Sequence, residues 1–204
     1  QEVMLSGIIT VTRLPEHWAG KAEAVDFYDI KHDVEMLLRF AFIPAVYTGH
    51  ASLPVGMATI PGLSIVTSMF MHGGFMHLAG NMLFLWIYGD NVERRLGAVP
   101  FVFWYLLTGA AATLFHAAVF SSSNAPLVGA SGAISGVLGF YFIWFPKNVV
   151  RVLVLLPPFF PVIQVPARVV LGVFIVLENM LPFLFAGEGG VAHGAHIGGF
   201  LAGV

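Results

Sequence analysis

Long apolar segments separated by short polar connections dominate the last two-thirds of the chain. A helix needs about 20 apolar residues to cross a bilayer. Four segments approach or exceed that length, namely 70–89, 98–120, 125–146 and 169–187, the last interrupted by Glu178. A fifth, 190–204, has about two-thirds of the length of a span. The pattern therefore predicts an all-α fold in the form of a polytopic membrane helical bundle.

The apolar stretch 152–166 departs from this pattern because it contains four prolines. These are Pro157, Pro158, Pro161 and Pro166. Proline removes a backbone donor and clashes with the preceding helical turn. We therefore expect an interfacial connection here rather than a regular helix.

Composition supports a membrane protein. Hydrophobic residues make up 58% of the chain and charged residues 10%, whereas a soluble domain carries about 25% charged residues. The net charge is −2 with no basic block, so a nucleic-acid partner is not expected. The chain has no cysteine, which excludes disulfides, thiolate metal ligands and thiol catalysis. The sequence carries no pattern that specifies an oligomeric state.

The distribution of basic residues predicts the direction of the spans. The connections 90–97 and 147–168 carry Arg94, Arg95, Lys147, Arg151 and Arg168. The alternate connections, 121–126 and 187–190, carry no Lys or Arg. Because basic connections face the cytoplasm, the first, third and fifth spans are expected to enter from the outside.

Residues 1–60 are predicted to form a separate extracytoplasmic region before the core of residues 61–204. They hold seven acidic and four basic residues and no apolar run of 18. We expect an amphipathic, partly helical region with a turn-rich stretch at 49–62. The chain begins at Gln1 and stops at Val204 within an apolar run, so we expect a fragment, with one further span preceding Gln1.

Four polar side chains fall at a similar shallow depth in three different spans. At about 1.5 Å per residue, Ser131 lies roughly 8 Å and His196 roughly 9 Å from the outer ends of their segments. His77 and Asn81 lie on the order of 5 and 10 Å deep, and their spacing of four places them on one helix face. Polar groups at membrane depth are functional candidates, so we expect a common site.

Small residues favour a close approach of the helices that carry Ser131 and His196. They form one face on each segment, with Gly132, Gly136 and Gly139 on one and Gly199 and Gly203 on the other. Such faces let helix backbones approach closely in lipid. We expect this packing to bring the serine and the histidine within hydrogen-bonding distance.

The chemistry of these groups suits acyl transfer. A serine becomes a nucleophile when a neighbouring base accepts its proton, and His196 is a suitable base. The resulting oxyanion needs hydrogen-bond donors. The backbone N–H of Ser131 at a helix N-terminus, the Asn81 amide and the His77 imidazole are the candidates.

Three motifs resemble the rhomboid intramembrane serine proteases. They are HGGFMHLAGN at 72–81, GASG at 129–132 and AHIGG at 195–199, and NVERRLG at 91–97 is also similar. The resemblance runs from about residue 64 to residue 204. It implies a six-helix core, of which the first helix is missing here and the last truncated, and cleavage of transmembrane protein substrates near their outer membrane boundary.

Carried over residue by residue, the resemblance makes Ser131 the nucleophile and His196 the base, with no third triad member. His77, Asn81 and Gly129 are expected to serve the oxyanion and the substrate. Some rhomboids have a tyrosine stacked on the histidine one turn after the nucleophile, where this chain has Ser135.

Other interpretations were weighed against this one. One alternative is a catalytically inactive rhomboid-like protein that binds membrane clients, although such proteins typically lose the serine or the histidine. Another is a proton transporter or channel, which would want charged residues along a whole pathway. A metal bound by His72 with His77, or by His193 with His196, lacks a nearby carboxylate and the His-Glu-x-x-His signature.

Three further polar residues carry weaker hypotheses. Ser135 shares the helix face of Ser131 and is a minor candidate for the nucleophile. Glu178 lies next to Asn179 and either lines a substrate gate or is solvated. His116 is expected to make a structural contact between helices.

The sequence therefore predicts a cofactor-free intramembrane serine endopeptidase without a metal. Its partners would be transmembrane protein substrates and the lipid bilayer. We expect a multi-pass protein of the bacterial inner membrane, with the active site facing outward.

Overall fold

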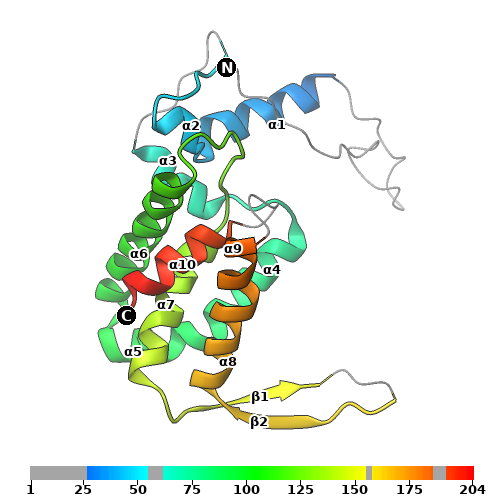
Figure 1. Cartoon of the computed structure of the whole chain (residues 1–204), viewed down its shortest axis with the longest axis vertical. Coiled ribbons are helices and arrows are strands. Elements are labelled where there is room, and N and C mark those ends of the chain that lie inside the picture. Colours follow the sequence, from blue (N-terminus) through cyan, green and yellow to red (C-terminus); the bar gives the residue numbers. More distant parts are fainter. Residues whose placement is uncertain (1–26, 55–61, 155–157, 186–191) are drawn as a thin grey trace, which may run out of the picture.

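The computed structural model describes residues 27–54, 62–154, 158–185 and 192–204. These residues are mostly helical (Figure 1). The N-terminal elements are α1 (Phe27–Phe40), α2 (Pro44–Tyr47), α3 (Leu63–Thr67) and the 3₁₀ turn η1 (Ser68–Phe70). The remaining helices are α4 (Phe75–Phe84), η2 (Leu85–Gly89), α5 (Asp90–Leu96), α6 (Ala98–Val119), α7 (Ser131–Trp144), α8 (Ala167–Ile175), η3 (Val176–Met180), α9 (Leu181–Phe185) and α10 (His193–Ala202).

A two-stranded hairpin corrects the all-α prediction. Strands β1 (Val149–Leu153) and β2 (Val162–Pro166) pair antiparallel, with Arg151 opposite Gln164. β-Branched residues suit a pleated strand, and prolines are tolerated at strand ends. The stretch predicted to be an irregular connection is therefore a hairpin that projects at one end of the helices (Figure 1).

Among the described residues, two continuous helices are long and apolar enough to cross a membrane. One is α6, whose bounds agree with the predicted segment 98–120. The other runs through α8, η3 and α9 over Ala167–Phe185. Within it, η3 is π-helical: the backbone N–H of Leu181 donates to the carbonyl of Val176, five residues earlier. This π turn contains Glu178 and Asn179.

In the part of the chain that the structure describes, the other three predicted segments hold no helix with the length and hydropathy of a span, and their ends also differ from the prediction. The helix of the first predicted segment, 70–89, begins with α4 at Phe75. It continues through the π turn η2 into α5, so most of the predicted connection 90–97 is helical. It stops where Gly97 adopts a φ of 88°. Helix α7 begins at Ser131 rather than residue 125, because Leu127 instead pairs with Phe42 as a β-bridge.

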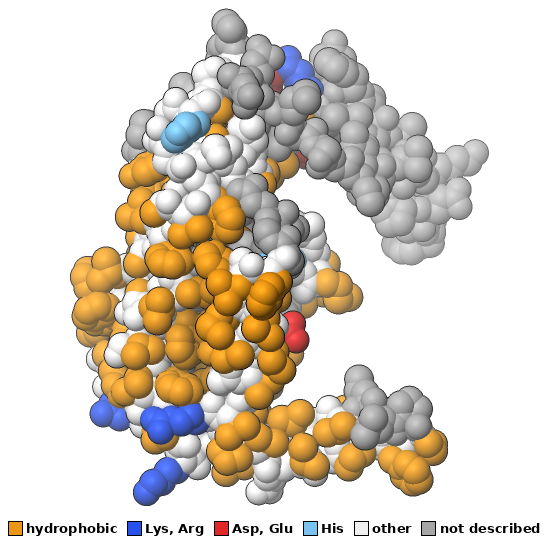
Figure 2. All heavy atoms as spheres, viewed as in Figure 1, with side chains coloured by type: hydrophobic (Ala, Val, Ile, Leu, Met, Phe, Trp, Pro, Cys, Tyr) orange, Lys and Arg blue, Asp and Glu red, His pale blue; other side chains and the backbone are white. Residues whose placement is uncertain are grey.

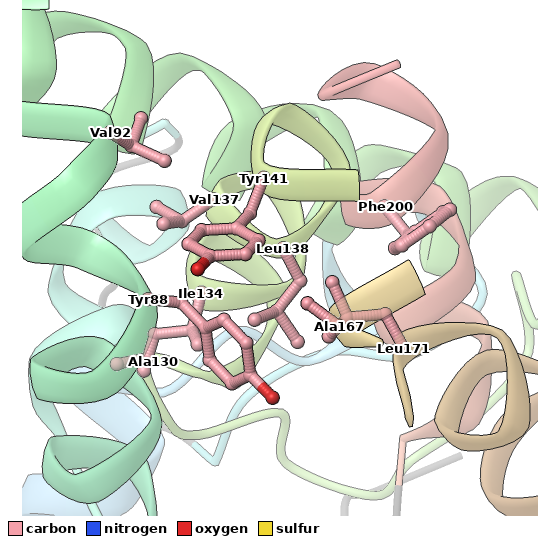
Figure 3. Packing of buried hydrophobic residues seen from close by; sticks show 10 residues of the cluster. All are labelled: Tyr88, Val92, Ala130, Ile134, Val137, Leu138, Tyr141, Ala167, Leu171 and Phe200. Carbon is pink, nitrogen blue, oxygen red and sulfur yellow. The ribbon is translucent and has the colours of Figure 1, made fainter. Parts of the chain in front are cut away.

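The core lies around α7 (Figure 3). Its buried side chains come from η2, α5, α7 with the residue before it, α8 and α10. They are Tyr88, Val92, Ala130, Ile134, Val137, Leu138, Tyr141, Ala167, Leu171 and Phe200. The Tyr88 and Tyr141 rings meet edge to face with centroids 5.0 Å apart. Helix α7 is therefore central, and the other helices cover it.

A seam of glycines joins α7 to α10, as predicted. A Cβ atom on Gly199 would collide with the carbonyl oxygen of Gly132, and one on Gly203 would collide with the carbonyl oxygen of Gly136. A Cβ on Gly139 would meet the backbone of α10 as well. The two backbones thus touch without intervening side chains, which only glycine allows.

The outer face of the helices is apolar (Figure 2). Large hydrophobic side chains such as Trp86, Val99 and Phe185 are at least three-quarters exposed. In Figure 2 the visible hydrophobic side chains form a broad band, and Lys and Arg side chains gather at its lower edge. Exposed apolar surface on this scale is typical of a protein in contact with lipid.

Residues 41–48 pack onto the connection before α7. Phe42 exchanges two backbone hydrogen bonds with Leu127, of 3.2 and 2.7 Å, and Phe42 is fully buried. The Ala45 N–H donates to the carbonyl of Ser123 at 2.9 Å. This part of the predicted 1–60 region is therefore attached to the helical body. The predictions for residues 1–26, and for residues 55–61 of the turn-rich stretch, lie outside the described residues.

Candidate active site

Ser131 is the first residue of α7. The preceding Gly129 has a φ of 121°, a conformation that favours glycine, and its N–H donates to the carbonyl of Ser68 at 2.8 Å. This turn directs the chain into the helix. The first N–H groups of a helix have no partner within it and carry the positive end of the helix dipole, so Ser131 lies where negative charge is stabilised.

His196 is on the first turn of α10 and reaches Ser131. The distance between His196 Nε2 and Ser131 Oγ is 2.8 Å. The glycine seam explains this distance, since the backbone contact between Gly199 and Gly132 sets the separation of the two helices one turn away. The predicted approach of these two side chains is thus found in the structure.

Asn179 completes the surroundings of His196. Its Oδ1 lies 2.6 Å from His196 Nδ1, and the side chain is buried, with 1% of its surface exposed. In the sequence, Asn179 stands out only as the neighbour of Glu178, and no role is predicted for it. The signal that could have indicated a role for Asn179 is its polar amide within a segment that is otherwise apolar enough to span a bilayer.

His77 and Asn81 lie on α4 and line the same cavity as Ser131 and His196. The Gly73 N–H donates to His77 Nδ1 at 3.3 Å. His77 Nδ1 is therefore an acceptor, and Nε2 carries the hydrogen. The Asn81 amide donates one hydrogen to the carbonyl of His77 at 2.9 Å, which leaves its second hydrogen for another acceptor.

Gly129 separates the His77 ring from Ser131. A Cβ on Gly129 would lie 2.8 Å from His77 Cε1, 2.9 Å from its Nε2 and 3.7 Å from Ser131 Oγ. The absence of a side chain therefore allows the imidazole N–H of His77 to lie near the serine. All five residues singled out from the sequence meet in this region.

A cavity of about 560 Å³ opens beside these groups. Its wall is mainly apolar, with contributions from Met76, Phe84, Ile134, Leu138 and Phe174, and its polar groups come from the residues described above together with Ser135. A largely apolar pocket with a few convergent polar groups is typical of a substrate site.

The remaining polar residues considered from the sequence differ in their burial and in their contacts with the site. Ser135 is buried one turn after Ser131. His72 packs edge-on against His77 with ring centroids 5.3 Å apart, and His193 lies similarly beside His196 at 6.4 Å. Glu178 is exposed and does not line the cavity. Among the described residues, no group of three or more His, Asp or Glu side chains could hold a metal ion.

Comparison with known proteins identifies the family of this helical core. The Rhomboid domain model matches residues 61–204. "Rhomboid protein 1, mitochondrial" of Saccharomyces cerevisiae is 33% identical over 150 residues, which are 70% of this chain and 40% of that protein. "RHOMBOID-like protein 4" of Arabidopsis thaliana is 34% identical over 149 residues, again 70% of this chain and 32% of the relative. The chain thus spans less than half of the length of these relatives.

A different protein resembles the N-terminal part. The model of the phenylalanyl tRNA synthetase beta chain CLM domain matches residues 1–59. The phenylalanine–tRNA ligase beta subunit of Haemophilus influenzae is 60% identical over 38 residues, which are 19% of this chain and 5% of that protein. None of the residues of the candidate site lies in this region. The rhomboid match covers more than two-thirds of the chain and includes the whole site, so the chain belongs to the rhomboid family.

Proposed function

We propose that the protein is an intramembrane serine protease that hydrolyses peptide bonds of transmembrane substrates. The observation that carries this proposal is the 2.8 Å hydrogen bond between Ser131 Oγ and His196 Nε2 beside the cavity. Family membership supports it, because rhomboids are generally proteases of this kind. Ser131 is the nucleophile and His196 is the general base.

The reaction follows from the positions of these groups. His196 Nε2 accepts the hydroxyl proton while Ser131 Oγ attacks the peptide carbonyl, and a tetrahedral oxyanion forms. His196 then returns the proton to the leaving amine, and an acyl-enzyme on Ser131 remains. A water molecule, deprotonated by the same nitrogen, hydrolyses the ester and restores the serine.

Three donors favour the oxyanion. They are the backbone N–H of Ser131 at the start of α7, the imidazole Nε2–H of His77 and the free amide hydrogen of Asn81. Donors placed in advance of the reaction stabilise the charge that develops in the transition state. The apolar wall of the cavity lowers the local dielectric and strengthens this stabilisation.

The same proposal places the helices in a bilayer as a polytopic bundle. The apolar exposed band and the two helices of spanning length support it. The basic residues near the β1–β2 hairpin favour a cytoplasmic location for that end. The cavity then opens toward the outer face, where water for hydrolysis is available.

The test is cleavage of a fluorogenic transmembrane peptide by the protein in liposomes. We expect cleavage by the parent, and a loss of at least about 10³-fold in kcat for Ser131→Ala and for His196→Ala, because either change removes the activated nucleophile. Chelators should leave the rate unchanged. Ser122→Ala, at an exposed serine in the connection before α7, is the matched control and should cleave like the parent.

Each contrary result has a distinct meaning. Full activity in Ser131→Ala would refute the assignment of the nucleophile. Loss of activity with chelators would transfer the chemistry to the histidines. A folded parent that cleaves no substrate and does not react with a fluorophosphonate would instead support a client-binding rhomboid.

A further inference from the structure

Asn179 is a buried amide on a helix whose other described residues are mainly apolar. An amide away from water is costly unless its polar atoms have partners. Both sides of this amide are hydrogen-bonded, since Oδ1 lies 2.6 Å from His196 Nδ1 and Nδ2 donates to the carbonyl of Phe174 at 3.0 Å. Asn179 is therefore held in place by its own helix while it contacts the base.

These two bonds determine which nitrogen of His196 carries the hydrogen. A carbonyl can only accept, so the atom of Asn179 that faces Phe174 is the NH₂ group and the atom that faces His196 is the oxygen. An amide oxygen also can only accept, so His196 Nδ1 must be the donor. Nε2 of the neutral ring is then left without hydrogen and accepts from the Ser131 hydroxyl.

The π turn explains why Asn179 reaches the histidine. Within η3 the hydrogen bonds run over five residues instead of four, which changes the rotation of the side chains about the helix axis. Asn179 is consequently buried while the adjacent Glu178 is exposed. Turns of this kind occur frequently at functional sites.

We propose that Asn179 is the positioning residue of His196, which holds the imidazole in the Nδ1–H tautomer and supports it when Nε2 accepts the serine proton. This role rests on the proposed protease function. Asn179 is not among the residues that line the cavity, so it acts through the histidine.

The consequence is kinetic. A histidine in the Nε2–H tautomer cannot accept the serine proton, and in soluble serine proteases a wrong tautomer lowers kcat by up to about 10⁴-fold. Asn179 is neutral and its bond is weaker than that of a carboxylate. We therefore expect Asn179→Leu to lower kcat by about 10-fold to 100-fold with little change in KM, because substrate contacts are intact.

Two matched variants separate positioning from packing. Asn179→Asp keeps an oxygen acceptor for His196 and should retain most of the activity that Asn179→Leu loses. Met180→Leu, at an exposed neighbour in the same π turn, should match the parent in both kcat and thermal midpoint. An Asn179→Leu enzyme with parental kcat, or an Asn179→Asp enzyme as impaired as Asn179→Leu, would overturn the proposal.

A spectroscopic measurement tests the tautomer of the parent directly and does not depend on turnover. In ¹⁵N-histidine-labelled protein in liposomes, the ring signals of His196, assigned by their loss in His196→Ala, should report the Nδ1–H tautomer. Asn179→Leu should mix the two tautomers. A parent with the Nε2–H tautomer contradicts the proposal. Because this signal does not need turnover, it remains readable even if the protein cleaves nothing, so the two proposals fail separately.

Discussion

At the scale of single residues, Gly129 shows how closely the site is packed. Its φ of 121° is a conformation that residues with a side chain rarely adopt. A methyl group there would also press on the His77 ring, at 2.8 Å from Cε1. The backbone conformation at residue 129 and the position of the His77 ring therefore both require that this residue has no side chain.

We predict that Gly129→Ala lowers kcat/KM by about 100-fold, because displacement of His77 removes an oxyanion donor. The measurement is peptide cleavage in liposomes, with thermal midpoints to confirm folding. Gly49→Ala is the matched control, since Gly49 also has a positive φ, of 79°, but open space around its Cβ position. A folded Gly129→Ala protein with parental kcat/KM would show that His77 does not contribute.

The residues of the site differ in how far the sequence could predict them. Ser131, His196, His77, Asn81 and Gly129 stand in recognisable motifs, and depth alone placed four of them in one layer. The role of Asn179 could not be read in the same way. Whether residue 178 or 179 faces α10 depends on the rotation accumulated along the helix, and a π turn, which has no reliable sequence signal, changes that rotation.

At the scale of elements, the contact between α7 and α10 determines the distance between Ser131 and His196. The seam consists of glycines. The backbone of the facing helix fills the space that a side chain at each glycine would need. Interiors are closely packed, so a methyl group added there forces the backbones apart. Separation of the helices would lengthen the Ser131–His196 hydrogen bond.

We predict that Gly199→Ala destabilises the protein by about 3 kcal/mol, at the upper end of typical overpacking, and abolishes cleavage. Gly172→Ala in α8 is the control, because nothing lies within 4 Å of a Cβ at that position. It should be neutral or stabilising by up to about 1 kcal/mol, since alanine favours helices. Thermal or denaturant unfolding in detergent measures the stability of both variants. Equal stability changes in the two would contradict the close backbone contact between α7 and α10.

Helix positions were predicted better than their ends. The apolar segment 98–120 predicts the bounds of α6 almost to the residue, because Gly97 and the polar run after Phe120 end the helix through local sequence alone. The start of α7 depends instead on a bridge between Phe42 and Leu127, residues 85 positions apart. The β1–β2 hairpin was missed because its prolines exclude a helix but do not exclude strand ends.

At the scale of the whole molecule, the proposed orientation in the bilayer has a direct test. The chain has no cysteine, so single cysteines can be introduced at Ser122 and Lys147, both exposed and in successive connections. In intact cells, a membrane-impermeant maleimide should label Ser122→Cys. It should label Lys147→Cys only after permeabilisation, because the proposed orientation puts the basic connection on the cytoplasmic side. Equal labelling of both before permeabilisation contradicts the topology.

The glycine seam also has a consequence for how the surrounding lipid acts on the enzyme. Ser131 and His196 belong to two helices whose backbones touch along the glycine seam. Asn179 belongs to a third helix, which has large exposed apolar side chains such as Leu177 and Phe185. A helix whose apolar length differs from the bilayer thickness responds by tilting. Changes in acyl-chain length should therefore leave the Ser131–His196 pair intact and act on the orientation of its imidazole, so that membrane thickness becomes a regulator of turnover rather than of folding.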